Sequence, residues 1–260
     1  WVLEDAHLRA IVSPEAGGRV VALVSKHGGL NLTNSVGALR DHFDYAEPPP
    51  GRLPARARGA AGLFNRNYRA EWLQEGAGPA LRLAADAPDV YPDGARVAKT
   101  IRLNPRSERG EQPAANTRQE AETREWGGLD VEYNVSLAPA ATGQPQPQAF
   151  VSVHSVPALL RGDRTTRFCW LPAGAETSVH DSAETCELFQ PGGRTAVPEG
   201  VTSMTVRTPG AGALRLEWGE GTMAVEMKNY SALLKLKFPP LAPGGAAGQY
   251  RLRMELRDAE

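Results

Sequence analysis

Hydrophobic and polar residues alternate along much of the chain, most clearly near its C-terminal end. Three segments there show the alternation: 223–228, 234–238 and 250–256. A period of two residues is typical of a β-strand that packs one face and leaves the other polar. In the first segment, one face is predicted to hold Met223, Val225 and Met227, and the other Ala224, Glu226 and Lys228. The pattern therefore predicts a sheet with the carboxylate of Glu226 at a fixed place on one face.

The same alternation appears near the N-terminus and continues through the chain. Residues 8–12 alternate, and residues 19–24 are apolar at nearly every position, which predicts a strand buried on both faces. We count about fifteen predicted strands, and only the segment 118–124 would suit a short helix. The sequence therefore predicts an all-β fold, one large antiparallel β-sandwich that spans residues 1–260 as a single domain.

Segments rich in proline, glycine and charge interrupt the predicted strands. Gly17 and Gly18 mark a tight connection between the first two long strands. Residues 48–62 and 104–128 have no hydrophobic period. We expect both to be mobile surface loops, because they offer little apolar surface to offset the entropy of ordering.

The composition excludes some classes of function. Of the 260 residues, 41% are hydrophobic, which is enough for a large core. The net charge is -1 with both signs mixed, which argues against a nucleic-acid surface or an anchor to anionic membranes. No apolar run reaches the roughly 18 residues of a membrane-spanning helix. The chain begins at Trp1 rather than Met, which we interpret as a removed leader or a piece of a longer protein.

The two cysteines, Cys169 and Cys186, leave two interpretations open. Both lie in β-like segments, so they could form one disulfide between neighbouring strands. They could also be two free thiols, one of them buried as a small hydrophobic residue. A disulfide would require an oxidising compartment and would place the protein in the periplasm or outside the cell. Two cysteines without clustered histidines do not make a zinc site, and we expect no metal and no cofactor.

Four motifs, taken together in their order and spacing, resemble a known family. They are a Ser-Pro-Glu turn with Gly-Gly-Arg-Val near the N-terminus, VAKTIRL at 97–103, LDVEYNVSL at 129–137, and LAPGG at 241–245 before YRLRMEL. This pattern resembles galactose mutarotase-like domains, which include the aldose 1-epimerases and sugar-binding domains of carbohydrate-active enzymes. The resemblance spans most of the chain and implies a β-sandwich with a carbohydrate ligand.

The resemblance also implies two catalytic residues. Opening and reclosing a sugar ring at its anomeric carbon needs a base for the hydroxyl proton and an acid for the ring oxygen. In the family a Glu and a His on a sheet face supply them, which implies roles for Glu226 and His154 here. The sequence departs from the family pattern, since Val153 replaces an Asn, Met227 replaces a Pro, and the segment between His154 and Glu226 is short. The alternative for both residues is an ordinary polar position on a strand.

Five further residues are candidates for sugar contacts. Arg66 and Arg69 could donate hydrogen bonds to hydroxyl groups, and surface charge is the alternative for both. Asp41 and His42 form an acid–imidazole pair within RDHF, a string that resembles one in mutarotase-like domains of α-glucan-processing enzymes and implies a structural role there. Trp170 could stack on the apolar face of a pyranose, or pack in the core.

Two functions fit these residues. The first is a carbohydrate-recognising mutarotase-like domain, accessory to glycan metabolism. The second is a divergent aldose or hexose-phosphate 1-epimerase with His154 and Glu226 as an acid–base pair. The sequence identifies neither the sugar nor the oligomeric state.

Overall fold

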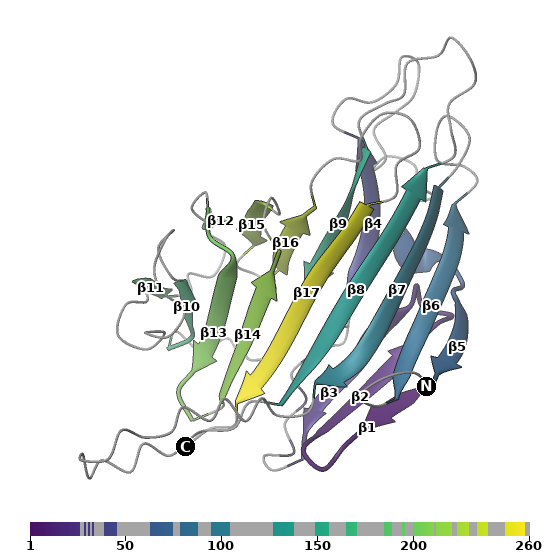
Figure 1. Ribbon diagram of the computed structural model, residues 1–260. Coiled ribbons are helices and arrows are strands. Elements are labelled where there is room, and N and C mark those ends of the chain that lie inside the picture. The colour runs from purple at the N-terminus through teal and green to yellow at the C-terminus, as the bar shows by residue number, and fades with distance from the viewer. Residues whose placement is uncertain are drawn as a thin grey trace, which may run out of the picture.

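The computed structural model shows an antiparallel all-β protein (Figure 1). It describes residues 1–26, 29, 31, 33, 39–45, 63–74, 79–87, 95–104, 127–137, 149–155, 165–170, 185–188, 194–195, 200–210, 212–219, 223–228, 233–238 and 248–257. These residues form seventeen strands and one 3-10 turn, η2 (Leu63–Asn65), and no α-helix occurs among them. The predicted all-β sandwich is confirmed. The expected loop over 48–62 and the helix at 118–124 lie outside these residues, as does the part 105–126 of the expected loop over 104–128. The ends of that predicted loop, residues 104, 127 and 128, belong to strands instead.

The N-terminal strands form a small sheet of their own. Its order is β1 (Val2–Glu4), β2 (Leu8–Ser13) and β3 (Arg19–Ser25). In β2, Leu8, Ala10 and Val12 are buried, as the alternation predicts. In β3 the prediction of burial on both faces is only half right, because Val20 and Leu23 are fully buried while their neighbours are partly exposed. One face of β3 packs against the core and the other is only partly covered.

A nine-stranded sheet forms the main layer. In spatial order its strands are β11 (Thr185–Leu188), β10 (Arg167–Trp170), β13 (Ser203–Thr208), β14 (Gly212–Trp218), β17 (Gly248–Arg257), β8 (Gly127–Leu137), β7 (Ala95–Asn104), β6 (Ala80–Ala87) and β5 (Arg69–Leu73). The C-terminal strand β17 lies in the middle of this sheet, between β14 and β8. Strands from both halves of the sequence therefore build one layer.

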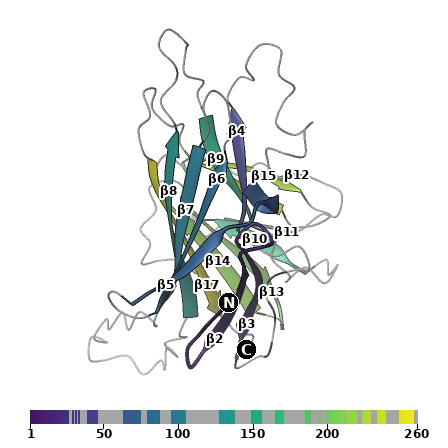
Figure 2. The ribbon, with the colours of Figure 1, turned by 90° about the vertical axis from the view of Figure 1, so that its right-hand side faces the viewer.

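A five-stranded sheet forms the second layer (Figure 2). Its strands, in spatial order, are β12 (Arg194–Thr195), β15 (Met223–Lys228), β16 (Leu233–Lys237), β9 (Ala149–Ser155) and β4 (Arg40–Tyr45). Leu236 of β16 is fully buried, as is Tyr133 of β8 in the opposite sheet, and both belong to the same hydrophobic core. The core therefore fills the space between the two large sheets, and each sheet has one outer face turned away from it.

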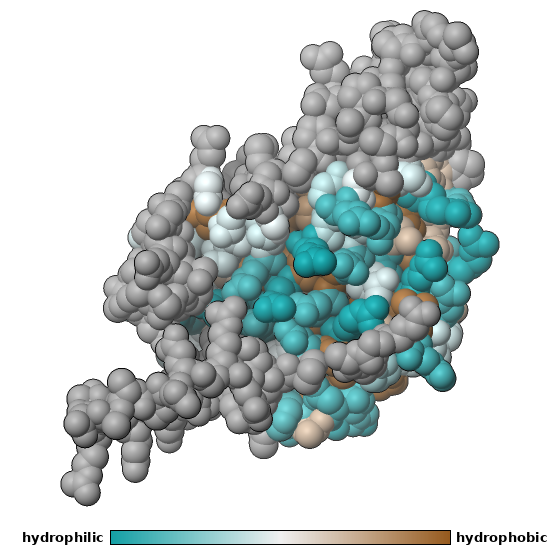
Figure 3. All heavy atoms as spheres, viewed as in Figure 1, coloured by the Kyte–Doolittle hydropathy of each residue, from teal (hydrophilic) through white to brown (hydrophobic). Residues whose placement is uncertain are grey.

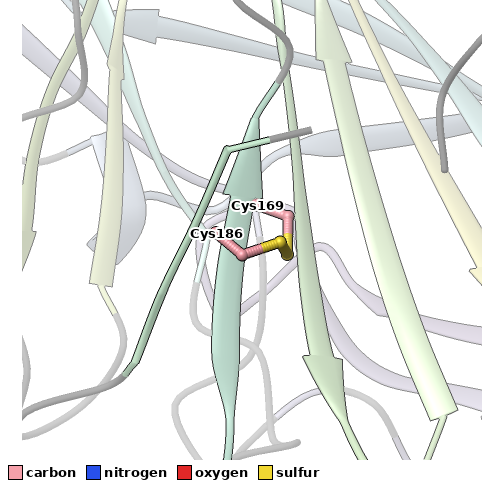
Figure 4. Close-up of a disulfide and its surroundings, with 2 residues drawn as sticks. All are labelled: Cys169 and Cys186. Atoms are coloured by element: carbon pink, nitrogen blue, oxygen red, sulfur yellow. A yellow bond between two sulfur atoms is a disulfide. The ribbon is translucent and has the colours of Figure 1, made fainter. Parts of the chain in front are cut away.

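A disulfide joins the last two strands at one edge of the nine-stranded sheet (Figure 4). Cys169 of β10 and Cys186 of β11 are directly opposite each other in the strand register. Of the two interpretations of these cysteines, the disulfide between neighbouring strands is the one in the structure. Every described residue of β11 is exposed, so the disulfide ties a strand with little buried surface to the sheet.

The described residues contain no helix that is long and apolar enough to cross a membrane.

Candidate functional site

Glu226 and His154 lie in one row across the five-stranded sheet. Lys235 of β16 is paired on one side with Glu226 of β15 and on the other with His154 of β9. His154 is paired in turn with Arg40 of β4. Neighbouring strands are about 4.8 Å apart, so the backbone positions of Glu226 and His154 are about 10 Å apart. Directly paired residues of antiparallel strands share a face of the sheet, so the whole row lies on one face.

A β-bulge decides which face Glu226 occupies. The register of β15 against β16 shifts between Ala224 and Glu226, so that Val225 is an extra residue. A bulge turns the following residue to the opposite face, and such features often re-aim a side chain beside a site. The predicted strict alternation of 223–228 is therefore wrong at its start. Met223 shares a face with Glu226, and Ala224 takes the other face.

This row lies on the outer face of the five-stranded sheet. The neighbouring row contains Asp41 and Leu236, both paired with Val153. Asp41 and Leu236 have no exposed surface, and Asp41 contacts residues of the nine-stranded sheet. Successive residues of a strand point to opposite faces. The positions of Glu226 and His154 are therefore on the side turned away from the nine-stranded sheet.

Directly beneath the row, a buried ionic network joins the two large sheets. The Nζ atom of Lys99, on β7, donates hydrogen bonds to Asp41 Oδ2 at 2.7 Å and to the Leu39 carbonyl oxygen at 3.2 Å. The hydroxyl groups of Tyr68 and Tyr133 donate to the two carboxylate oxygens of Asp41, at 3.1 and 3.0 Å. The Lys99 ammonium also lies over both tyrosine rings, 5.3 and 5.7 Å from their centroids. Both oxygens of the buried Asp41 carboxylate are thus engaged by partners inside the protein.

Burial dominates the titration of this network. It raises the pKa of the Asp41 carboxyl above its ordinary value and lowers the pKa of the Lys99 ammonium. The positive charge of Lys99 opposes the rise in the pKa of Asp41, and the negative charge of Asp41 opposes the fall in the pKa of Lys99. Burial also raises the pKa of both tyrosine hydroxyls well above the ordinary value, so they stay protonated donors. The network holds β4 in place, and with it the position of Arg40.

The predicted arginines lie in different places. Arg66 follows the η2 turn, which packs beside β4. Its positive charge acts to lower the pKa of Tyr68 in the buried network, against the larger effect of burial. Arg69 lies in β5, where its side chain forms an ion pair of 3.2 Å with Asp86 and is largely exposed. That pair is on the outer face of the nine-stranded sheet. The structure therefore brings Arg66 near the β4 end of the row, and it does not bring Arg69 there.

Three other predicted contacts have distinct outcomes. Asp41 is fully buried and engaged by three partners, so a direct contact with a sugar is corrected to the structural role that its motif implied. His42 is paired with Ser152 of β9, two residues along β4 from Arg40, and therefore shares the outer face. Trp170 is only 6% exposed and belongs to the core, so the stacking prediction is corrected to packing.

Sequence reasoning missed Lys235 and Lys99. The alternation of 234–238 places Lys235 on the polar side of its strand, but its place between Glu226 and His154 depends on strands far apart in the sequence. Lys99 stands in the buried phase of an alternating strand, between Val97 and Ile101, which are both fully buried. A charge at a position that the pattern assigns to the core indicates a buried partner, and that signal was available.

The outer face of the nine-stranded sheet is a second polar surface (Figure 3). A hollow of about 420 Å³ lies there between strands β7, β8, β14 and β17. Two of its arginines are paired with carboxylates: Arg253 forms two hydrogen bonds to Asp130, at 2.7 and 3.3 Å, and Arg251 forms one of 3.1 Å to Glu132. The hollow is lined by as many carboxylates as arginines, namely Asp130, Glu132 and Glu217 against Arg102, Arg251 and Arg253. Within the residues described, no cluster of three or more His, Cys, Asp or Glu side chains could hold a metal ion.

Comparison with known proteins identifies the fold. No protein-family profile matches the chain, and no curated protein matches its sequence. Solved structures do match over almost the whole chain. A galactose mutarotase-like protein from Lactobacillus casei has 13% identity and a TM-score of 0.62, with 99% of both chains covered. A galactose 1-epimerase from Lactobacillus acidophilus has 9% identity and a TM-score of 0.59, covering 100% of this chain and 94% of its own.

The same fold also occurs as part of larger proteins. A 4-alpha-glucanotransferase from Thermococcus litoralis matches 99% of this chain with 37% of its own, at 13% identity and a TM-score of 0.53. The chain therefore has the fold of the galactose mutarotase-like and aldose 1-epimerase superfamily, which its sequence motifs resemble.

Proposed function

We propose that the chain is a carbohydrate-recognising mutarotase-like domain, accessory to glycan metabolism, whose ligand binds on the outer face of the five-stranded sheet. The observation that carries the proposal is that Glu226 and His154 are both paired with Lys235. A carboxylate, an ammonium and an imidazole in one row offer acceptors and donors over the width of a sugar ring. Such groups are the usual partners of sugar hydroxyls.

Two observations support a binding role. The strand row rests on a rigid base, because the Asp41–Lys99 network fixes β4 against the opposite sheet. Rigid strands hold functional groups more precisely than loops do. The departures at Val153 and Met227 from the family's catalytic motifs are compatible with recognition without turnover.

A 1-epimerase is the second candidate, and the same row favours it. Anomer interconversion needs a base and an acid on either side of one ring. Glu226 and His154 are two strands apart in the register, which suits that arrangement. In this role Glu226 takes the proton of the anomeric hydroxyl, and His154 protonates the ring oxygen.

Calorimetric titration and polarimetry on the same preparations test both candidates. Wild type and the variants Glu226→Gln and His154→Ala are titrated with glucose, galactose and short glucans. They are then assayed by polarimetry on fresh α-glucose and α-galactose. Glu217→Gln, the same change on strand β14 of the other sheet, is the matched control.

The recognition role predicts binding that weakens in both site variants and a polarimetric rate at the buffer background. The epimerase role predicts a rate above background in wild type and in Glu217→Gln that Glu226→Gln abolishes. If neither site variant differs from wild type in binding or in rate, the outer face of the five-stranded sheet is not the site.

A further inference from the structure

The edge strand β11 is held to the nine-stranded sheet mainly by its disulfide. Among the strands that the structure describes, β10 is its only partner, through a register of four residue pairs. All four residues of β11 are exposed, and Leu188, its only large apolar side chain, is 53% exposed. β11 therefore buries little apolar surface, and hydrogen bonds that water can replace add little net stability. A segment with few buried contacts opens locally at a lower free energy than the whole domain does.

The neighbouring strand β10 is anchored independently of β11. Phe168 and Trp170 are 2% and 6% exposed and belong to the hydrophobic core. On its other side, β10 is paired with β13 along all four of its residues. β10 therefore keeps its place in the sheet when β11 leaves, and it then becomes the edge strand.

The two cysteines of the bond differ in exposure. Cys169 has no exposed surface, whereas Cys186 is exposed like the rest of β11. Thiol–disulfide exchange begins with the attack of a thiolate on one sulfur, so its rate depends on access to that sulfur. A reagent in solution therefore reaches the bond from the Cys186 side. Exposed disulfides are more easily reduced than buried ones, and the labile and regulatory disulfides belong to this group.

We infer that the Cys169–Cys186 disulfide is a redox latch on β11. A dithiol reductant opens the latch, β11 leaves the sheet, and the rest of the domain stays folded. The inference goes beyond the proposed function, because the latch lies in the nine-stranded sheet and the proposed ligand site lies on the five-stranded one.

The exchange takes place in two steps. A thiolate of the dithiol attacks the Cys186 sulfur and forms a mixed disulfide, while the bond to Cys169 breaks and Cys169 leaves as a thiolate that takes up a proton. The second thiol of the dithiol, as its thiolate, then attacks the reductant's own sulfur in the mixed disulfide and releases Cys186 in the same way. Two electrons thus pass from the dithiol, which becomes a disulfide, to the two cysteines.

The latch controls which strand forms this edge of the sheet. With the bond closed, β11 covers the backbone of β10 on that side. With the bond open, the N–H and C=O groups of β10 that were paired with β11 become available, and such groups can pair with another strand. The oxidised and reduced forms therefore present different strand edges.

Hydrogen exchange of the folded protein, with and without dithiothreitol, tests the inference, and alkylation followed by intact mass shows whether both cysteines are reduced. After reduction we expect the amides of 185–188 to exchange at about the rate of an unfolded chain. The amides of 248–257, in β17, should still exchange at least about a hundredfold more slowly than that. The double variant Cys169→Ala, Cys186→Ala should behave like the reduced wild type under both conditions. Leu188→Ala, which alters the same strand but keeps the bond, should keep the protection of the oxidised wild type.

Four results would overturn the inference. A bond that dithiothreitol does not reduce in the folded protein is a permanent cross-link. Full protection of 185–188 after reduction would show that strand pairing alone holds β11. Rapid exchange of 185–188 before reduction would show that the bond holds no ordered strand. Loss of protection throughout 248–257 on reduction would show that the bond is needed for the whole sheet.

Discussion

Lys99 donates a hydrogen bond of 2.7 Å to Asp41, and neither side chain has any exposed surface. Removing one member of such a pair leaves an uncompensated charge in the core, which usually costs ~3–5 kcal/mol of stability. We therefore expect Lys99→Met and Asp41→Leu each to lower the free energy of unfolding by about that amount. The double variant should lose clearly less than the sum of the two. Urea denaturation of the four proteins measures this coupling, and strictly additive losses would contradict it.

The disulfide should contribute measurably to stability. Cys169 and Cys186 are 17 residues apart, and a loop of this length predicts a stabilisation of ~3 kcal/mol from the reduced entropy of the unfolded chain. We expect the double variant Cys169→Ala, Cys186→Ala to lose about this amount in guanidinium denaturation. Dithiothreitol should lower the midpoint of the wild type and leave that of the double variant unchanged. A wild type insensitive to the reductant would argue against the bond.

Gly18 is required by both its backbone and its neighbour. Its φ angle is +60°, and a Cβ atom there would lie 3.0 Å from the ring of Tyr68, a member of the buried network. Gly29 has a similar φ of +62° but open space around its Cα. We expect Gly29→Ala to cost ~1 kcal/mol through backbone strain, and Gly18→Ala to cost roughly 1–2 kcal/mol more through the contact with Tyr68. Thermal unfolding of the two variants makes the comparison, and equal losses would show that the contact relaxes freely.

Glu255 should make stability depend on pH. Burial raises the pKa of its carboxyl above the ordinary 4.5, and the negative charge of Glu217 adds to the effect. Because the pKa of Glu255 is raised in the folded state, the contribution of this residue to the free energy of unfolding is fully present below pH 4.5. That contribution is lost as the pH rises through the folded-state pKa. Glu255→Gln should therefore equal wild type near pH 4 and gain a few tenths of a kcal/mol, roughly, by pH 7. Denaturation at both pH values measures this, with Glu132→Gln as an exposed control. A gain that is the same at both pH values would exclude titration as its cause.

The sequence by itself determined where most of the strands lie and which residues of each strand face the core. In β17, Leu252 and Met254 are buried and Arg251 is exposed, and in β16 Leu236 is buried, as the alternation predicts. The reason is local, because a strand sends successive side chains to opposite faces whatever it is paired with. The resemblance to mutarotase-like domains came from the same local motifs.

Only the tertiary structure decided what those faces meet. The extra residue Val225 moves Glu226 to the outer face, and no pattern in the sequence marks it, because a bulge is defined by the partner strand. The row that joins Glu226 to His154 runs through β16, and Lys235 has its place there because hydrogen bonds connect segments distant in the chain. The burial of Asp41 depends on its ion pair with Lys99, which lies 58 residues later in the chain. The pairing of Cys169 with Cys186 depends on the register between β10 and β11. Periodicity describes one strand at a time, whereas a site, an ion pair or a disulfide needs the register between strands.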